Sequence, residues 1–222
     1  MSKAVDVVRF DILTVKPYLK SFLLLIALGL MIGIGNKDSL VIPPMFMVWA
    51  SFFVAYPFSI AEKNSLDKLW GTFSLKRKDI VAGRYIFSLC STIFSMLLAV
   101  VLVYASSAVI KSVVEIQALV FVMCMGFFLF SFIVSFQIPL YFKLGYTKAR
   151  VVTYIPLFAI GFLMPAISFL PDDSGVAGFF REIGKTIEEQ PYLAYVICLG
   201  ASFIMLWISY LVSRKFYEDK EL

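Results

Sequence analysis

The sequence predicts an all-α integral membrane protein with six transmembrane helices and no soluble domain. Three observations predict this class: 61% of the 222 residues are hydrophobic, only 16% are charged, and the apolar residues gather in long runs. Ordinary globular domains carry about 25% charged residues, so water is not the main solvent of this chain. The net charge of +5 therefore indicates basic residues that flank membrane spans, and it does not indicate a nucleic-acid partner.

The apolar runs divide the chain into six expected spans. A bilayer core about 30 Å thick takes about 20 predominantly apolar residues in helical form. The runs cover residues 18–35, 39–61, 85–110, 116–142, 151–170 and 192–213. The first run is short, but Lys20 can extend its amine to the membrane interface. Together the spans form one transmembrane domain over residues 1–222.

The basic residues determine the expected orientation. Lys and Arg accumulate in the short cytoplasmic loops of membrane proteins. With the spans given above, all 20 Lys and Arg lie on one side except Lys37, Lys111, Arg181 and Lys185. Both termini are therefore expected in the cytoplasm, with the chain in the cell membrane as a multi-pass protein.

Two segments outside the spans have helical apolar stripes. Before the first span the stripe consists of Val5, Val8, Ile12, Val15 and Leu19. This pattern predicts an amphipathic surface helix over residues 3–16, with a bend at Pro17. Between the fifth and sixth spans, an extracellular amphipathic helix is predicted from Val176, Phe179, Phe180, Ile183 and Ile187. Lipid contact and packing on neighbouring helices explain either stripe equally well.

Charged side chains are missing from the predicted membrane interior. Apart from Lys20 at the edge of the first span, no acidic or basic residue falls inside a span, and the chain has no His. Ion-coupled transporters usually need such residues as relays, and hydrolysis within a membrane needs a nucleophile with a base or a metal site. The sequence therefore predicts neither an enzyme nor an ion-coupled transporter, although backbone carbonyls at broken helices could still bind Na⁺.

The longest cytoplasmic connection, residues 62–84, reads as two helical pieces with a break at Gly71 and Thr72. Leu66, Leu69 and Trp70 share one face of the first piece. An exposed apolar ridge of this kind fits a groove on a partner protein. The alternative is a surface helix that packs against its own bundle.

Two loop sequences resemble a known family. Residues 56–85, YPFSIAEKNSLDKLWGTFSLKRKDIVAGRY, resemble the first cytoplasmic loop of ABC transporter permeases of the second type, in the small single-domain branch of the type V exporter fold. In that pattern a Glu opens the loop, a short helix and a hinge follow, and basic residues lead into Ile-Val-x-Gly-Lys/Arg-Tyr. Residues 139–150, PLYFKLGYTKAR, resemble the loop between the fourth and fifth spans. The hinge departs from the family, which commonly has Leu-Pro where this chain has residues 73–75, Phe-Ser-Leu.

The resemblance implies the permease subunit of a bacterial ATP-driven exporter. It implies a pairing with a second copy or a similar permease, and with two cytoplasmic ABC ATPase subunits that bind ATP and Mg²⁺. The chain itself would carry no catalytic, cofactor or metal site. A coupling helix that contacts the ATPase would contain Glu62, Ser65, Leu66, Asp67, Lys68, Leu69 and Trp70. The second cytoplasmic loop would contribute Lys143, Gly145, Lys148 and Arg150.

The substrate is expected to be hydrophobic or amphipathic, because the spans offer it few charges. Candidate lining residues are Phe46, Phe52, Phe53, Tyr56, Phe58, Phe162 and Met164, although lipid contact explains most of them equally well. We expect export of an amphipathic peptide such as a toxin or bacteriocin, with a lipid or hydrophobic drug as the next choice. A gradient-driven transporter or channel, and a non-transport immunity or assembly protein of the membrane, are the alternative functions.

Overall fold

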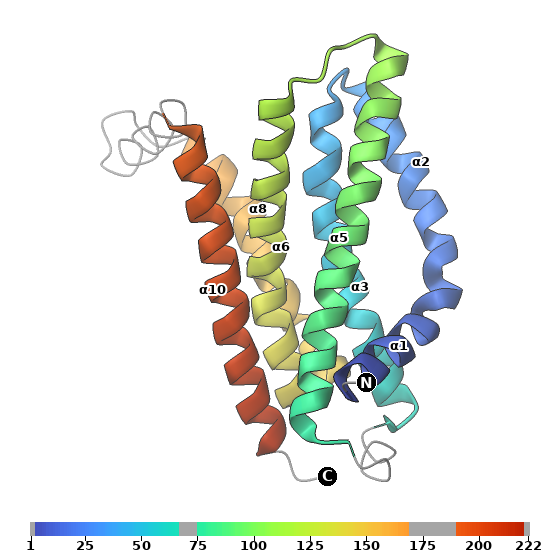
Figure 1. Cartoon of the computed structure of the whole chain (residues 1–222), viewed down its shortest axis with the longest axis vertical. Coiled ribbons are helices and arrows are strands. Elements are labelled where there is room, and N and C mark those ends of the chain that lie inside the picture. The colour runs from blue at the N-terminus through green and yellow to red at the C-terminus, as the bar shows by residue number, and fades with distance from the viewer. Residues whose placement is uncertain (1–2, 67–74, 169–189, 220–222) are drawn as a thin grey trace.

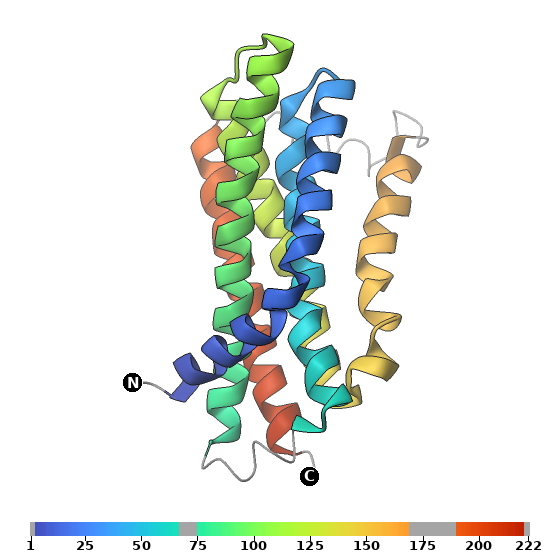
Figure 2. The same cartoon turned by 90° about the vertical axis from the view of Figure 1, so that its right-hand side faces the viewer.

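The computed structural model describes residues 3–66, 75–168 and 190–219, and these residues form helices and no strand. In chain order the elements are α1 (Lys3–Val15), η1 (Lys16–Leu19), α2 (Lys20–Gly35), η2 (Ser39–Val41), α3 (Ile42–Lys63), α5 (Arg77–Ile110), α6 (Ile116–Leu144), α7 (Tyr146–Ala149), η3 (Val152–Tyr154), α8 (Ile155–Ser168) and α10 (Pro191–Glu218). The long helices stand side by side, and α1 crosses the lower part of α5 (Figure 1, Figure 2).

Four described helical stretches are long and apolar enough to cross a membrane, namely Ser39–Lys63, Arg77–Ile110, Ile116–Leu144 and Tyr192–Glu218. A fifth candidate arises if Lys3–Tyr18 and Leu23–Gly35 form one broken span, with a bend of 70° between them. Within the described residues, α2 has 16 residues and α8 has 14, which corresponds to about 24 and 21 Å of rise, less than a bilayer core of about 30 Å. The all-helical membrane architecture is confirmed, whereas the count of six spans stays a prediction.

The ends of several helices follow local sequence signals. α3 begins at Ile42, and Pro43 and Pro44 follow in its first turn, where an N–H group would have no intrahelical partner. Lys111, with φ 55°, ends α5, and Gly145, with φ 80°, ends α6. α5 begins at Arg77, before the expected start of the third span at residue 85. The helix of the apolar run thus extends toward the N-terminus and includes the basic residues that precede this run.

The core lies between α3, α5, α6 and α10. α6 packs against both α10 and α3, and α3 packs against α5. Met47, Val81 and Phe130 are fully buried in this core. At Gly126 a Cβ atom would lie 2.8 Å from the Cγ atom of Met47, so the glycine allows α6 to approach α3 closely.

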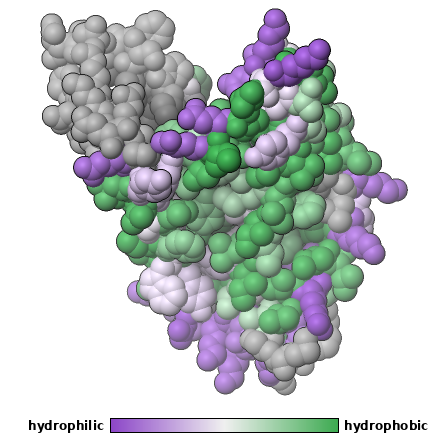
Figure 3. All heavy atoms as spheres, turned by 45° about the horizontal axis from the view of Figure 1, so that its top comes forward, coloured by the Kyte–Doolittle hydropathy of each residue, from purple (hydrophilic) through white to green (hydrophobic). Residues whose placement is uncertain are grey.

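The surface is apolar around the middle of the molecule. Figure 3 shows a broad hydrophobic area with hydrophilic residues gathered toward the two ends. Leu97 of α5 is 64% exposed and Trp207 of α10 is 65% exposed. Soluble proteins rarely expose large continuous apolar surfaces, so these side chains indicate contact with lipid.

α1 and the described parts of the predicted cytoplasmic loops lie at one end of the bundle, which we call the basal end. α3 ends there, α5 begins there, and α6 and α10 both end there (Figure 1). The expected placement of both termini in the cytoplasm stays a prediction.

Candidate functional site

Glu62 joins the two cytoplasmic loops at the basal end. It lies in the last turn of α3, and its Oε2 atom accepts a hydrogen bond from the backbone N–H of Thr147 at 3.1 Å. Thr147 belongs to the first turn of α7. A carboxylate at this position accepts a hydrogen bond from an N–H group that has no intrahelical partner. Glu62 therefore lies within the last turn of α3, which ends at Lys63, and joins this turn to the second loop.

Gly145 allows the second loop to approach Glu62. Its φ of 80° and ψ of 164° lie in a region that essentially only glycine adopts. A Cβ atom at this position would lie 3.0 Å from the Oε2 atom of Glu62. The N–H group of Gly145 donates to the carbonyl of Tyr141 at 3.0 Å, which closes α6. Both the turn and the nearby carboxylate therefore require a glycine at position 145.

Arg77 fastens the other end of the first loop to α10. Its Nη1 atom donates to the carbonyl of Tyr217 at 3.1 Å and also to the carbonyl of Glu218. These carbonyls belong to the last turn of α10, where a cation meets the negative end of the helix dipole. The first loop is therefore attached at both ends. Where α3 ends, Glu62 joins it to α7, and where α5 begins, Arg77 joins it to α10.

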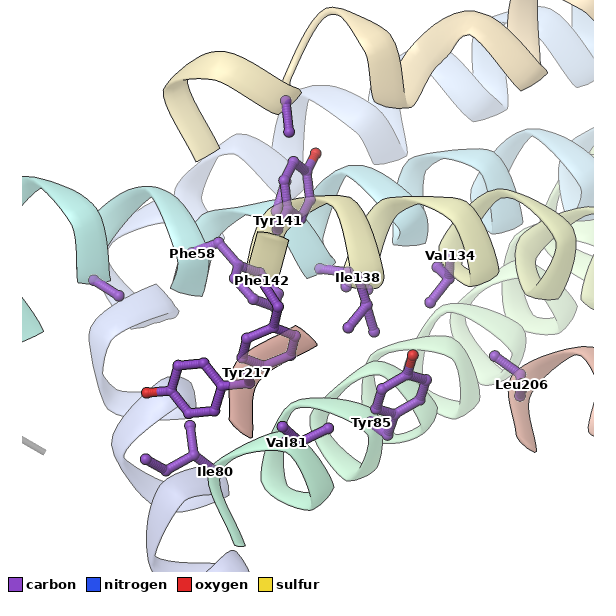
Figure 4. Close-up of a cluster of buried hydrophobic side chains, with 14 of the residues drawn as sticks. Phe58, Ile80, Val81, Tyr85, Val134, Ile138, Tyr141, Phe142, Leu206 and Tyr217 are labelled. Atoms are coloured by element: carbon purple, nitrogen blue, oxygen red, sulfur yellow. The ribbon is translucent and has the colours of Figure 1, made fainter. Parts of the chain in front are cut away.

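An aromatic cluster lies between these two attachments, and it borders a cavity of about 260 Å³. The centre of the Phe58 ring lies 5.1 Å from the ring centres of Tyr141 and Phe142, and the ring centres of Phe142 and Tyr217 lie 4.9 Å apart. Figure 4 shows Phe58, Phe142 and Tyr217 close together. The cluster packs the basal ends of α3, α6 and α10 against one another, so a displacement of one end is passed to the others.

A buried ion pair holds α1 against α5. The Nη1 atom of Arg84 lies 3.3 Å from the Oδ1 atom of Asp11, and the two side chains are 3% and 1% exposed. The guanidinium of Arg84 also lies 4.7 Å from the centre of the Phe58 ring. Within the described chain neither carboxylate oxygen of Asp11 has a hydrogen-bond partner. Asp11 therefore relies on Arg84, whereas Arg84 has a second favourable contact.

The face of α1 that packs on the bundle differs from the predicted stripe. The buried residues are Ala4, Val7, Val8, Asp11 and Val15, whereas Val5 and Ile12 are 37% and 49% exposed. A Cβ atom at Gly83 of α5 would lie 2.7 Å from the Cβ atom of Val7. Packing on α5 is therefore the arrangement that α1 adopts, and the glycine allows the two helices to touch.

The remaining predicted coupling residues are placed as follows. Ser65 is exposed and has a left-handed backbone, with φ 50°. Leu66 is 8% exposed and belongs to the core of this chain, although the sequence predicted an apolar side chain offered to the ATPase. Asp67, Lys68, Leu69 and Trp70 lie outside the described residues, as does the predicted extracellular helix at 176–187. Their roles stay predictions.

In the second loop, three predicted residues carry exposed positive charge. The Nζ atom of Lys143 lies 4.7 Å from the centre of the Phe216 ring of α10. Lys148 and Arg150 are exposed at the end of α7. The carbonyl of Arg150 accepts a hydrogen bond from the hydroxyl of Thr153 at 2.9 Å. The loop thus joins α10 through Lys143 and offers basic side chains at the basal surface.

The candidate lining residues do not gather around one cavity. Phe46, Phe53 and Phe58 are buried in three different core clusters. The ring of Phe52 contacts the ring of Tyr154 at 5.2 Å, and the ring of Tyr56 contacts that of Tyr18 at 4.9 Å. Phe162 is 76% exposed on α8, which stands apart from the central helices (Figure 2). The side chain of Met164 lies outside the described residues.

Sequence reasoning missed the contact between Asp11 and Arg84. A signal was available, because Asp11 falls on the same helical face as Val8 and Val15, three residues after the one and four before the other. A carboxylate on an apolar face needs a partner when that face is buried. Periodicity identifies this need, but it does not say which distant residue meets it.

The family assignment follows from a comparison with known proteins. The family described as ABC-2 family transporter protein matches residues 7–218. The match includes every long helix of the fold and both basal loops. The chain therefore belongs to the ABC-2 family of membrane transporter proteins, which implies an ABC ATPase partner in general terms. Among curated proteins there is no match, and among solved structures there is none either.

Proposed function

We propose that this chain is the membrane-spanning permease subunit of an ATP-driven exporter. It pairs with a second copy or a similar permease, and two separate cytoplasmic ABC ATPase subunits bind ATP and Mg²⁺ and hydrolyse the ATP. The basal end faces the cytoplasm of a bacterial cell. The substrate is hydrophobic or amphipathic, and an amphipathic peptide fits best.

One observation carries this proposal, namely the attachment of the first basal loop at both of its ends. Glu62 fastens the end of α3 to α7, and Arg77 fastens the start of α5 to the last turn of α10. A force applied to the loop by a cytoplasmic motor therefore reaches four helices at once. Packed helices shift as rigid bodies between discrete arrangements, so pushing on this loop is an effective way to change the state of the whole bundle.

The proposed coupling contact is best tested at Leu69. Leu66 is buried in the chain's own core, so Leu66→Asp would unfold the basal end whatever its role. We expect Leu69→Asp to reduce recovery of the ATPase about thirty-fold, because removing an apolar anchor at an interface costs about 2 kcal/mol or more. The measurement is affinity purification of the tagged chain from native membranes, followed by mass spectrometry.

The matched control is Val113→Asp. Val113 is 97% exposed in the connection between α5 and α6, at the end of the bundle opposite the proposed contact. Val113→Asp introduces the same charge as Leu69→Asp, and this variant should leave recovery of the ATPase unchanged. Normal recovery with Leu69→Asp would contradict the coupling contact. Absence of any ABC ATPase from the unaltered chain would contradict the proposed function and favour a gradient-driven transporter or a non-transport role.

A further inference from the structure

An apolar groove lies at the elbow between α1 and α5, away from the basal cavity. Its volume is about 260 Å³, and its lining residues are Ile12, Val15, Phe53, Phe87, Cys90, Ser91 and Phe94. Val15, Phe53 and Phe87 are 4%, 5% and 6% exposed and form the floor of the groove. Ile12 and Phe94 are 49% and 52% exposed and form its rim. The groove is therefore a built concavity and not a flat lipid-facing surface.

The groove opens onto an apolar strip that runs along α5. Leu97 and Val101 follow Phe94 at helical spacing and are 64% and 62% exposed. From Phe87 to Val101 the helix rises about 21 Å, which is more than half of a bilayer core of about 30 Å. An extended hydrocarbon chain seated in the groove would continue along this strip toward the middle of the membrane.

The segment of α1 that lines the groove is flanked in sequence by exposed basic side chains. Between residues 9 and 20 the exposed charged side chains are Arg9, Lys16 and Lys20. The one acidic residue in this stretch is Asp11, which is buried against Arg84. Lys16 directly follows Val15 of the groove floor. An anionic group at this end would therefore meet basic side chains and no exposed carboxylate from this segment.

Two tyrosines mark the same end as a membrane interface. The ring of Tyr18 lies 4.9 Å from the ring of Tyr56, which lies 5.4 Å from the ring of Phe53 on the groove floor. Tyrosine collects at the depth of lipid headgroups, because its ring is apolar and its hydroxyl is polar. The groove thus starts at headgroup depth and leads into the hydrocarbon region.

We infer that the groove binds one acyl chain of an anionic phospholipid whose headgroup contacts Lys16 and Lys20. The acyl chain fills the space between α1 and α5, which keeps α1 docked beside its ion pair. A free phosphate has the headgroup charge but lacks the chain, so it should bind too weakly to compete. This inference does not depend on the identity of the exported substrate or on the ATPase.

Native mass spectrometry of the full-length chain in mild detergent tests the inference. The probes are phosphatidylglycerol and phosphatidylcholine with identical acyl chains. We expect one phosphatidylglycerol to be retained, and Lys16→Gln with Lys20→Gln should weaken its binding about 25-fold, because each basic residue near an anionic lipid changes binding about five-fold. The control is Lys37→Gln with Lys111→Gln, since these exposed lysines lie at the other end of the bundle, and it should leave binding unchanged.

Ser91→Phe tests the acyl chain separately from the headgroup. The added ring would occupy the groove, so retention of the lipid should be lost. Ile93→Phe is the matched control, because Ile93 is 56% exposed on the same helix and does not line the groove.

Equal retention of the two lipids by the unaltered protein would overturn the inference. The inference would also be overturned if the lysine variant kept its preference for phosphatidylglycerol, or if Ile93→Phe lost the lipid as fully as Ser91→Phe does. Full displacement of the lipid by inorganic phosphate would overturn it as well. If Ser91→Phe does not fold, the exposed lysine pair decides the question alone.

Discussion

Arg84→Met should release α1 from the bundle and destabilise the protein more than Asp11→Asn does. Without Arg84, Asp11 would be a buried charge with no partner, and breaking a buried pair in this way costs about 3–5 kcal/mol. Without the Asp11 charge, Arg84 keeps its contact with Phe58, and the neutral amide avoids the cost of burying a charged carboxylate, so Asp11→Asn should have much the smaller effect. The measurements are thermal unfolding and hydrogen exchange of the amides in α1.

The pH dependence distinguishes a charge effect from a simple packing defect. Burial raises the pKa of Asp11 from 3.8 to about 6, although the Arg84 guanidinium acts to lower it. Because this pKa is raised, the stability gained by protonation is fully present below about pH 4 and is lost as the pH rises through about 6. Removing Arg84 raises the pKa of Asp11 further. We therefore expect the defect of Arg84→Met to be large at pH 8 and much smaller at pH 5.

Arg214→Met provides the control for this experiment. Arg214 pairs with Glu218 at 2.7 Å, but the two side chains are 46% and 44% exposed. Solvent screens an exposed ion pair, which therefore contributes little, so this variant should change neither the unfolding temperature nor the exchange of α1 appreciably. Equal effects of Arg84→Met and Arg214→Met, or a defect that does not depend on pH, would show that the buried pair does not hold α1.

The second large effect is expected for Gly145→Ala. The backbone of Gly145 lies in a region that costs other residues about 1–3 kcal/mol, and the new methyl group would press on the Oε2 atom of Glu62. The contact between the two basal loops should therefore be lost. In the proposed complex, stimulation of ATP hydrolysis by substrate should fall several-fold in liposomes, while the ATPase still co-purifies.

Two further variants make this prediction specific. Gly161 of α8 has no neighbouring atom within 4 Å of an added Cβ, so Gly161→Ala should leave stability and stimulation intact. Glu62→Gln keeps an acceptor for the Thr147 N–H group but removes the charge. Its loss of stimulation should therefore lie between those of Gly145→Ala and Gly161→Ala. Normal stimulation with Gly145→Ala would show that the link between the loops does not transmit motion.

The sequence was informative where short-range patterns decide the structure. Apolar runs identified the membrane class and the approximate position of each long helix, because burial in lipid requires continuous apolar stretches. The glycine in PLYFKLGYTKAR was identified as part of a loop motif, and the structure gives the reason in the backbone of Gly145. These features depend on residues close together in the chain.

The rest depended on contacts between distant segments. Glu62 was predicted to contact the ATPase, which stays a prediction, and the structure adds a contact between its carboxylate and Thr147 of the second loop. Leu66 was expected on a surface ridge, but it is buried in the core. The contact of Glu62 depends on how α3 packs against α6 and α7, which no local pattern encodes.

The docking of α1 on α5 also determines the order in which the protein assembles. Asp11 is synthesised before α2 and α3, and its partner Arg84 only after them. While the ribosome is still making the intervening helices, the newly made N-terminal segment lacks α5, the helix that it packs against most, and its carboxylate stays hydrated. The first helix of the chain is therefore among the later ones to reach its final place.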